Sequence, residues 1–148
     1  MKAPNGFVFE KRQYGPDFTD EENAALKSCI YKYNEDIICF KEVPKQSVSQ
    51  LHIFFERIKE ETKDLEAYFV LVDLTEATPP PSDVRQFLSK KFSELAPNLK
   101  YSGVFTGKFF LMNIAAKFIL SGALGDKFSV HKTKEEALSA IKNAKRNI

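Results

Sequence analysis

The chain has 148 residues, of which 43% are hydrophobic and 28% charged, and its net charge at pH 7 is only +2. This length predicts one domain over residues 1–148 with a single core, in which residues 1–29 form an N-terminal extension. So small a net charge excludes an electrostatic argument for nucleic acid or an anionic membrane as the partner.

The sequence predicts a cytoplasmic protein without a transmembrane segment. No apolar run of signal-peptide length precedes Glu10. The longest apolar stretch, from Phe109 to Leu120, contains Asn113 and a lysine and is too short and too polar to cross a bilayer. Cys29 and Cys39 have neither CxxC spacing nor a nearby histidine, so we expect two reduced thiols.

The first forty residues give three local signals. Phe7–Tyr14 predicts an additional edge strand. Thr19 and Glu22 have the spacing of a capping box, which predicts a short helix before Leu26. The segment CIYKYNEDIICFKEV then contains two β-rich runs separated by Asn34–Asp36, which predicts a β-hairpin.

After the hairpin, helix-like and strand-like segments alternate. Ser47 and Gln50 form a second capping box, followed by apolar residues at helical spacing up to Ile58. The remaining predicted elements are a buried strand over Tyr68–Leu74, a helix over Val84–Leu95 that ends at Pro97 and Asn98, a strand over Lys100–Gly107, a helix from Phe109 to about Leu120 that stops near Gly122, a strand over Asp126–Lys132, and a last helix opened by the capping box of Thr133 and Glu136.

This order predicts an α/β fold. Short strands that alternate with helices favour a mixed, mostly parallel sheet with helices on both faces. The expected order is an N-terminal β-hairpin followed by αβαβαβα.

No residue pattern predicts a catalytic, metal or cofactor site. His52 and His131 belong to no HxxxH or HExxH pattern. The segment GVFTGKF has too few residues between its glycines, and lacks the Ser or Thr after Lys108, that a phosphate loop needs. We therefore expect a protein that is not an enzyme, with no metal and no cofactor.

One edge of the predicted sheet remains a candidate ligand site. The turns after the second and third core strands would bring Thr75, Ser82, Thr106, Gly107 and Lys108 to the carboxyl ends of the strands, where helix N-termini offer free N–H groups. A lysine at the start of a helix is unfavourable with the helix dipole unless an anion lies there. Equally, Lys108 could point into water, and both interpretations stay open.

The segment PPPSD raises a separate question about Ser82. Its prolines stop the strand, and a serine followed by Asp83 is typical of a helix N-terminus. A helix N-cap is thus the first interpretation of Ser82. A phosphoacceptor and a ligand contact are the alternatives.

The segment VLVDLTEATPPPSDVRQFL resembles the central strand, loop and helix of the STAS domain, the family of the SpoIIAA-like anti-sigma factor antagonists and the STAS/SEC14-type domains. The strand ends in the apolar-Asp-apolar triplet Val72-Asp73-Leu74, and Ser82 follows at the family's spacing. The closing segment FSVHKTKEEALSAI is similar to the strand, turn and helix that end the family's domain. The antagonists usually carry an Asp before the phosphorylated Ser, whereas this chain has Pro81.

The resemblance implies a SpoIIAA/STAS-like fold and a non-catalytic regulatory or protein-interaction module with an unidentified protein partner. The SEC14-type members imply an alternative, a carrier or sensor of a small apolar, lipid-like ligand. Because Pro81 replaces the usual Asp, the resemblance supports the fold better than a phosphorylation switch at Ser82.

The segment KFFLMNIAAKFILSGALG predicts a helix that is apolar around nearly all of its circumference. Such a helix is either buried on all sides or exposes a patch that something covers. The covers to consider are the first forty residues, a second copy of the chain in a homodimer, and an apolar ligand or membrane surface. The candidate interface or ligand residues on this helix are Phe109, Phe110, Met112, Phe118 and Ile119.

Overall fold

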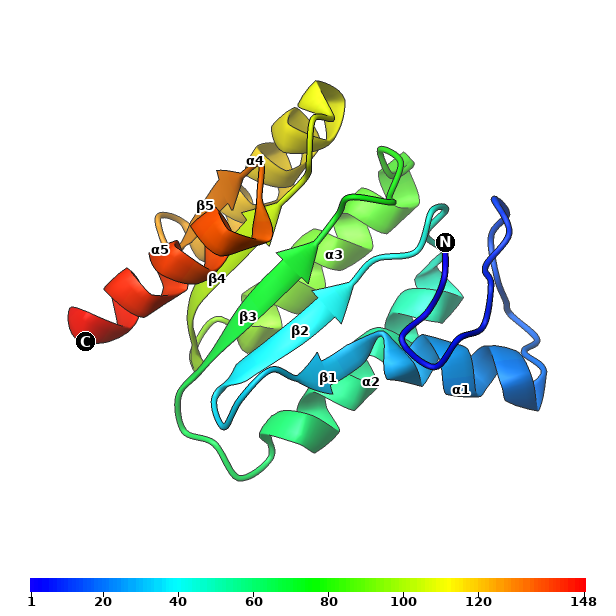
Figure 1. Ribbon diagram of the computed structural model, residues 1–148, viewed down its shortest axis with the longest axis horizontal. Helices are drawn as coiled ribbons and strands as arrows, with labels where there is room; N and C mark the ends of the chain where they lie inside the picture. The colour runs from blue at the N-terminus through cyan, green and yellow to red at the C-terminus, as the bar shows by residue number, and fades with distance from the viewer.

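The computed structural model, which describes all of residues 1–148, is built on a five-stranded sheet in the order β1-β2-β3-β4-β5 (Figure 1). β1 and β2 form the predicted antiparallel hairpin, and β2 to β5 are parallel to one another. The mixed, mostly parallel α/β sheet is therefore confirmed. The strands are β1 (Ile30–Lys32), β2 (Ile37–Lys41), β3 (Tyr68–Asp73), β4 (Leu99–Phe105) and β5 (Phe128–His131).

Five helices cover the two faces of the sheet unequally. Right-handed crossovers between strands that follow one another in sequence place every connecting helix on the same face. The last helix follows the last strand and crosses to the opposite face, where it lies in front of the sheet in Figure 1. The helices are α1 (Asp20–Ser28), α2 (Val48–Thr62), α3 (Ser82–Leu95), α4 (Phe110–Leu124) and α5 (Lys134–Arg146).

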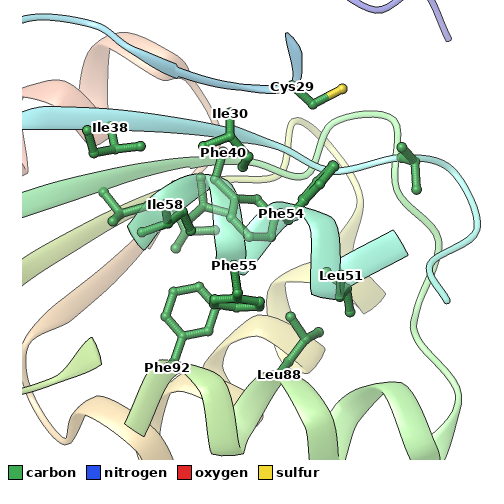
Figure 2. Packing of buried hydrophobic residues seen from close by; sticks show 14 of the residues in the cluster. Cys29, Ile30, Ile38, Phe40, Leu51, Phe54, Phe55, Ile58, Leu88 and Phe92 are labelled. Carbon is green, nitrogen blue, oxygen red and sulfur yellow. The ribbon is translucent and has the colours of Figure 1, made fainter. Parts of the chain in front are cut away.

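The larger core lies between the sheet and α1 to α4 and is centred on aromatic rings (Figure 2). Phe40 of β2 meets Phe54 of α2 edge to face at 5.2 Å between ring centroids, and Phe55 meets Phe92 of α3 at 5.4 Å. Edge-to-face pairs at these separations add stabilisation beyond burial of their area. This core fixes α2 and α3 on the sheet.

A smaller core lies on the opposite face, beneath α5. Ile37, Phe69 and Leu71 point to this face, and Ala137 and Ile141 of α5 cover them. Successive residues of a strand point to opposite faces, so β2 and β3 bury residues on both sides. The predicted buried strand over Tyr68–Leu74 is confirmed.

All three predicted capping boxes are present. The side chains of Thr19, Ser47 and Thr133 each accept the backbone N–H three residues on, and the glutamate or glutamine at that position accepts in return. These reciprocal bonds satisfy two donors that would otherwise be unpaired at each helix start. The starts of α1, α2 and α5 are therefore specified locally.

The N-terminal arm, residues 1–18, differs from the prediction. Phe7–Tyr14 is not an edge strand, and a single bridge between Lys2 and Val8 is its only sheet-like pairing. The arm folds back on itself because the rings of Phe7, Phe9 and Tyr14 pack against one another. Its aromatic residues join the larger core in place of pairing with β1.

The end of α4 also differs. The helix does not stop near Gly122 but continues to Leu124, which is buried, and Gly125 ends it with a positive φ of 63°. A glycine inside a helix lowers its stability by only about 1 kcal/mol relative to alanine, so packing of the last turn overrides it. Gly125 has the backbone conformation that glycine adopts without strain.

Candidate functional site

A groove of about 650 Å³ lies at the carboxyl ends of the central strands, and we call it the edge groove. The loop after β2 contributes Pro44 and Lys45, the loop after β3 contributes residues 75–79, and the start of α4 contributes residues 108–112. Lys11 reaches the groove from the N-terminal arm. Because β2, β3 and β4 are parallel, their carboxyl ends bring these three connections to one edge.

Hydrogen bonds hold the two loops that form the floor of the edge groove. The backbone N–H and hydroxyl of Thr78 both donate to the carbonyl oxygen of Pro44, at 3.0 and 2.7 Å. The side-chain amide of Gln46 donates in turn to the carbonyl oxygen of Thr78 at 3.1 Å. Asp73 accepts from the backbone and the hydroxyl of Thr75 at 2.9 and 2.6 Å, which fixes the turn after β3.

The edge groove carries an excess of unpaired positive charge. Lys11, Lys45 and Lys108 are exposed and none of them forms a salt bridge. Glu76 is the only carboxylate that lines the groove, and it is unpaired as well. The neighbouring Arg12, by contrast, is already paired with two glutamates.

A second, polar pocket of about 460 Å³ adjoins the edge groove and shares Lys11, Lys45, Thr78 and Pro79 with it. Its other walls are polar, and no large apolar side chain lines it. The two hollows thus form one continuous surface with an apolar end at α4 and a polar end beside the N-terminal arm.

The structure brings together only part of the ligand edge that the sequence predicted. Thr75 and Lys108 line the edge groove. Gly107 lies between them in the turn, with a φ of 64° that favours glycine. The side chain of Thr106 is buried and takes no part, and Ser82 lies outside the groove. The interpretation of Thr106 as a ligand residue is therefore wrong.

The classical crevice of an open α/β sheet is closed here. Adjacent connections leave for opposite faces only between β4 and β5, which is where such a crevice would form. There the backbone N–H groups of Thr106 and Gly107 donate to the carbonyl oxygens of His131 and Lys132, both at 3.0 Å. These bonds hold the two loops against each other. The edge groove lies instead beyond the carboxyl ends of β2 and β3.

Ser82 is not the N-cap of α3. Pro81 occupies that position with extended dihedrals, no side chain caps the helix, and Ser82 is its first residue. The Ser82 side chain is exposed and forms no hydrogen bond within the chain. The hydroxyl is free.

The large apolar side chains that are exposed on α4 and at its N-cap form what we call the α4 face. Phe109, Phe110 and Phe118, which the sequence predicted as contact residues, have exposed fractions of 58%, 73% and 75%. The prediction for Met112 and Ile119 is corrected, because both side chains are buried on the side of the helix that faces the sheet. The α4 face consists of Phe109, Phe110, Leu111, Ile114 and Phe118.

The first forty residues do not cover the α4 face. Its five side chains are exposed with these residues in place. The N-terminal arm is held at the start of α2, where Ser47 donates from its hydroxyl to the carbonyl oxygen of Tyr14 and the Gln13 amide donates to Gln46. Figure 1 shows the arm and α1 beside α2, and only Met1 and Lys11 of the arm reach the groove at the start of α4. The first forty residues are therefore excluded as the cover of the α4 face.

No enclosed cavity beside α4 is large enough for a chain-like ligand. The hollow between the sheet, α3 and α4 measures about 40 Å³ and is lined by apolar residues and Glu42. This is about the volume of one water molecule in the liquid. This hollow is therefore too small for a chain-like ligand.

The chain has two cysteines and no cluster of potential metal ligands. Cys29 and Cys39 are free and buried, and burial raises the pKa of the Cys29 thiol to about 12, which keeps it protonated. No group of three or more His, Cys, Asp or Glu side chains could hold a metal ion. None of the helices has the length and apolar character needed to cross a membrane.

Lys11 and Lys45 were not predicted from the sequence, although both line the edge groove. Lys45 carries a usable signal, because it follows a predicted strand whose carboxyl end must share the edge with the next strand. Lys11 carries none, since its place depends on how the N-terminal arm docks.

Comparisons with protein-family models, with curated proteins and with solved structures return no match.

Proposed function

We propose that the protein is a non-catalytic, STAS-like interaction module in the cytoplasm, and that a second copy of the chain binds its α4 face. The observation that carries the proposal is the exposure of five large apolar side chains on one helix. Exposed apolar patches of this kind mark interaction sites in proteins that are otherwise polar at their surface.

The size of the α4 face fits the centre of a dimer interface. Its three phenylalanines alone present roughly 400 Å², taking about 200 Å² for each exposed ring side chain. A stable interface buries about 800 Å² on each partner, of which the apolar centre is one part and a polar rim the rest. The three phenylalanines would therefore supply about half of one partner's share of such an interface.

The charge of α4 also supports a second copy as the occupant. Lys117 is the only charged residue in the 15 residues of this helix. Interface centres are depleted of charged residues and enriched in phenylalanine, and homodimer interfaces are the most apolar class. Lys117 lies three residues after Ile114 and next to Phe118, so it borders the α4 face, and a second copy has to leave its ammonium group in water.

Ser82 supports the regulatory part of the proposal. Its exposed hydroxyl lies at the first turn of α3, and α3 packs beside α4. A phosphate at this position would add about two negative charges next to the interaction surface, where the helix N-terminus tolerates them. The resemblance to STAS domains favours a switch at this residue, although Pro81 departs from the family's pattern.

Sedimentation equilibrium tests the dimer. The wild-type protein should have twice the chain mass of 16.9 kDa at tens of micromolar and dissociate on dilution. Phe118→Asp should be monomeric at the same concentrations. The matched control is Val8→Asp, since Val8 is 66% exposed on the N-terminal arm and should not affect association. A wild-type protein that stays monomeric at several hundred micromolar would contradict the proposal.

A second candidate function is binding of a small apolar molecule. The observation that favours it is the apolar wall of the edge groove, formed by the first turn of α4. The hollow beside α4 holds only about 40 Å³, so the proposal places the apolar molecule in the groove.

A further inference from the structure

We infer that the edge groove binds an amphiphilic anion, meaning an apolar chain or ring that carries one phosphate or carboxylate. The inference gives the second candidate function a site and a ligand class. Phe109, Phe110 and Leu111 belong to both the groove and the α4 face, so the ligand and a second copy would compete for these side chains, and either can bind without the other. The inference rests on three features of the groove: its apolar wall, its unpaired lysines and its continuity with the polar pocket.

The apolar part of the ligand would lie against the start of α4. Residues 109–112 line the groove, and Pro44, Ala77 and Pro79 from the loops after β2 and β3 line it as well. The floor is rigid, because Thr78 ties the two loops together through its bonds to Pro44. A preformed site with apolar walls and few polar groups is typical of small-molecule binding, and about 650 Å³ is within the usual range.

The anionic part of the ligand would meet the lysines. Lys11, Lys45 and Lys108 come from three separate segments and line the same groove, with Glu76 as the only opposing charge. A groove with three cations and one anion is strongly positive for a protein whose net charge is +2. No acidic residue occurs between Glu94 and Asp126, so neither β4 nor α4 can supply a counter-charge.

Lys108 is the most informative of the three lysines. It lies immediately before the N-cap of α4, where the partial positive charge of the helix end makes a cation unfavourable. Phe109 offers no side-chain cap, so the first N–H groups of the helix have no side-chain acceptor. Lys108 and these N–H groups therefore add to the positive potential that an anion meets in the groove.

The polar pocket gives the ligand an orientation. Lys11 and Lys45 line both hollows, so they mark the boundary between the apolar and the polar end. The headgroup would lie at this boundary and extend toward Gln13 and Gln46, while the apolar part lies toward Phe109. A bare phosphate would leave the apolar wall uncovered, and a cationic amphiphile would be repelled.

Titration calorimetry with dodecyl phosphate, below the concentration at which it forms micelles, tests the inference. We expect one molecule to bind per chain. Inorganic phosphate should bind at least a hundredfold more weakly, because it lacks the apolar part, and dodecyltrimethylammonium should not bind. These two probes distinguish an amphiphile site from a simple anion site and from a general detergent-binding surface.

Charge variants of exposed residues provide the site-specific test. Lys45→Gln should weaken dodecyl phosphate binding about tenfold, which is the usual effect of losing one charge-assisted contact. Glu76→Gln should tighten it, because the only opposing charge in the groove is removed. The matched control is Lys90→Gln, an exposed lysine on α3 outside the groove, which should leave binding unchanged.

Two results would overturn the inference. One is equal binding of dodecyl phosphate and dodecyltrimethylammonium, and the other is a Lys45→Gln variant that binds like Lys90→Gln. Phe118 does not line the groove, so Phe118→Asp should abolish the dimer and keep the ligand. Failure of the ligand site and failure of the dimer are therefore separate outcomes.

Discussion

The side-chain amide of Gln50, on α2, donates a 3.0 Å hydrogen bond to the carboxyl group of Glu42 at the end of β2, and both side chains are fully buried. The same oxygen of Glu42 also accepts from the backbone N–H of Val43 at 3.0 Å. No cation lies in this pair of contacts. Burial therefore dominates and raises the pKa of Glu42 to about 8, although both hydrogen bonds lower it.

The first prediction concerns pH. The pKa of Glu42 is about 8 in the folded chain and 4.5 in its ordinary state, so the folded protein holds this proton more tightly. The contribution of Glu42 to stability is fully present below pH 4.5 and is lost as the pH rises toward 8. Glu42→Gln, which cannot ionise, should remove this loss, which is at most about 5 kcal/mol between those limits.

Urea unfolding of the wild type and of Glu42→Gln at pH 5 and pH 8 measures the effect. The variant should be more stable than the wild type at pH 8, and the difference should shrink at pH 5. Glu66→Gln is the control, because this carboxylate is exposed and forms no salt bridge. Parallel pH curves for the wild type and Glu42→Gln would show that Glu42 titrates normally.

The second prediction compares two helix starts. Thr133→Ala should lower the free energy of unfolding by about 1 kcal/mol, because it removes the hydroxyl that caps α5. Ser82→Ala should change it by less than about 0.5 kcal/mol, since this hydroxyl caps nothing. Thermal or urea unfolding measures both. A loss of about 1 kcal/mol in Ser82→Ala would restore the N-cap interpretation.

The third prediction compares two glycines. A Cβ at Gly103 of β4 would lie only 2.6 Å from the carbonyl oxygen of Ala137, which is backbone and cannot yield easily. Gly103→Ala should therefore destabilise the protein by about 1–3 kcal/mol, as overpacking does. At Gly122 of α4 the nearest atom would be 3.9 Å away, so Gly122→Ala should stabilise the helix by up to about 1 kcal/mol. Equal effects at the two sites would mean that α5 does not pack closely on β4.

The fold could be predicted because its signals are local. Capping residues such as Thr19 and Ser47, and buried β-rich runs such as Tyr68–Leu74, depend on their sequence neighbours alone. Residues on one face of a helix recur every three or four positions, which in principle separates Met112 from Leu111. Because this helix is apolar all round, however, its sequence does not show which face the sheet buries.

The site was less predictable because it depends on tertiary contacts. Lys11 lines the edge groove only because Tyr14 and its neighbours pack the arm against the start of α2. Ser82 has the composition of an N-cap, but the helix begins one residue earlier than this composition indicates, with Pro81 as N-cap. Neither effect leaves a pattern in the sequence that points to the groove.

The fourth prediction separates the surface of α4 from its core at adjacent positions. Ile119→Ala should lower the free energy of unfolding by about 2–5 kcal/mol, because Ile119 is buried against the sheet. Phe118→Ala should lower the free energy of unfolding only slightly at low protein concentration, where its side chain is exposed.

If a second copy covers Phe118, the melting temperature of the wild type should rise with protein concentration by mass action, and that dependence should vanish in Phe118→Ala. Calorimetry at 5 and 200 µM, roughly a fortyfold range, measures it. A concentration dependence that persists in Phe118→Ala but disappears in Val8→Asp would assign self-association to the N-terminal arm, where Val8 is exposed, and would remove the α4 face from the proposal.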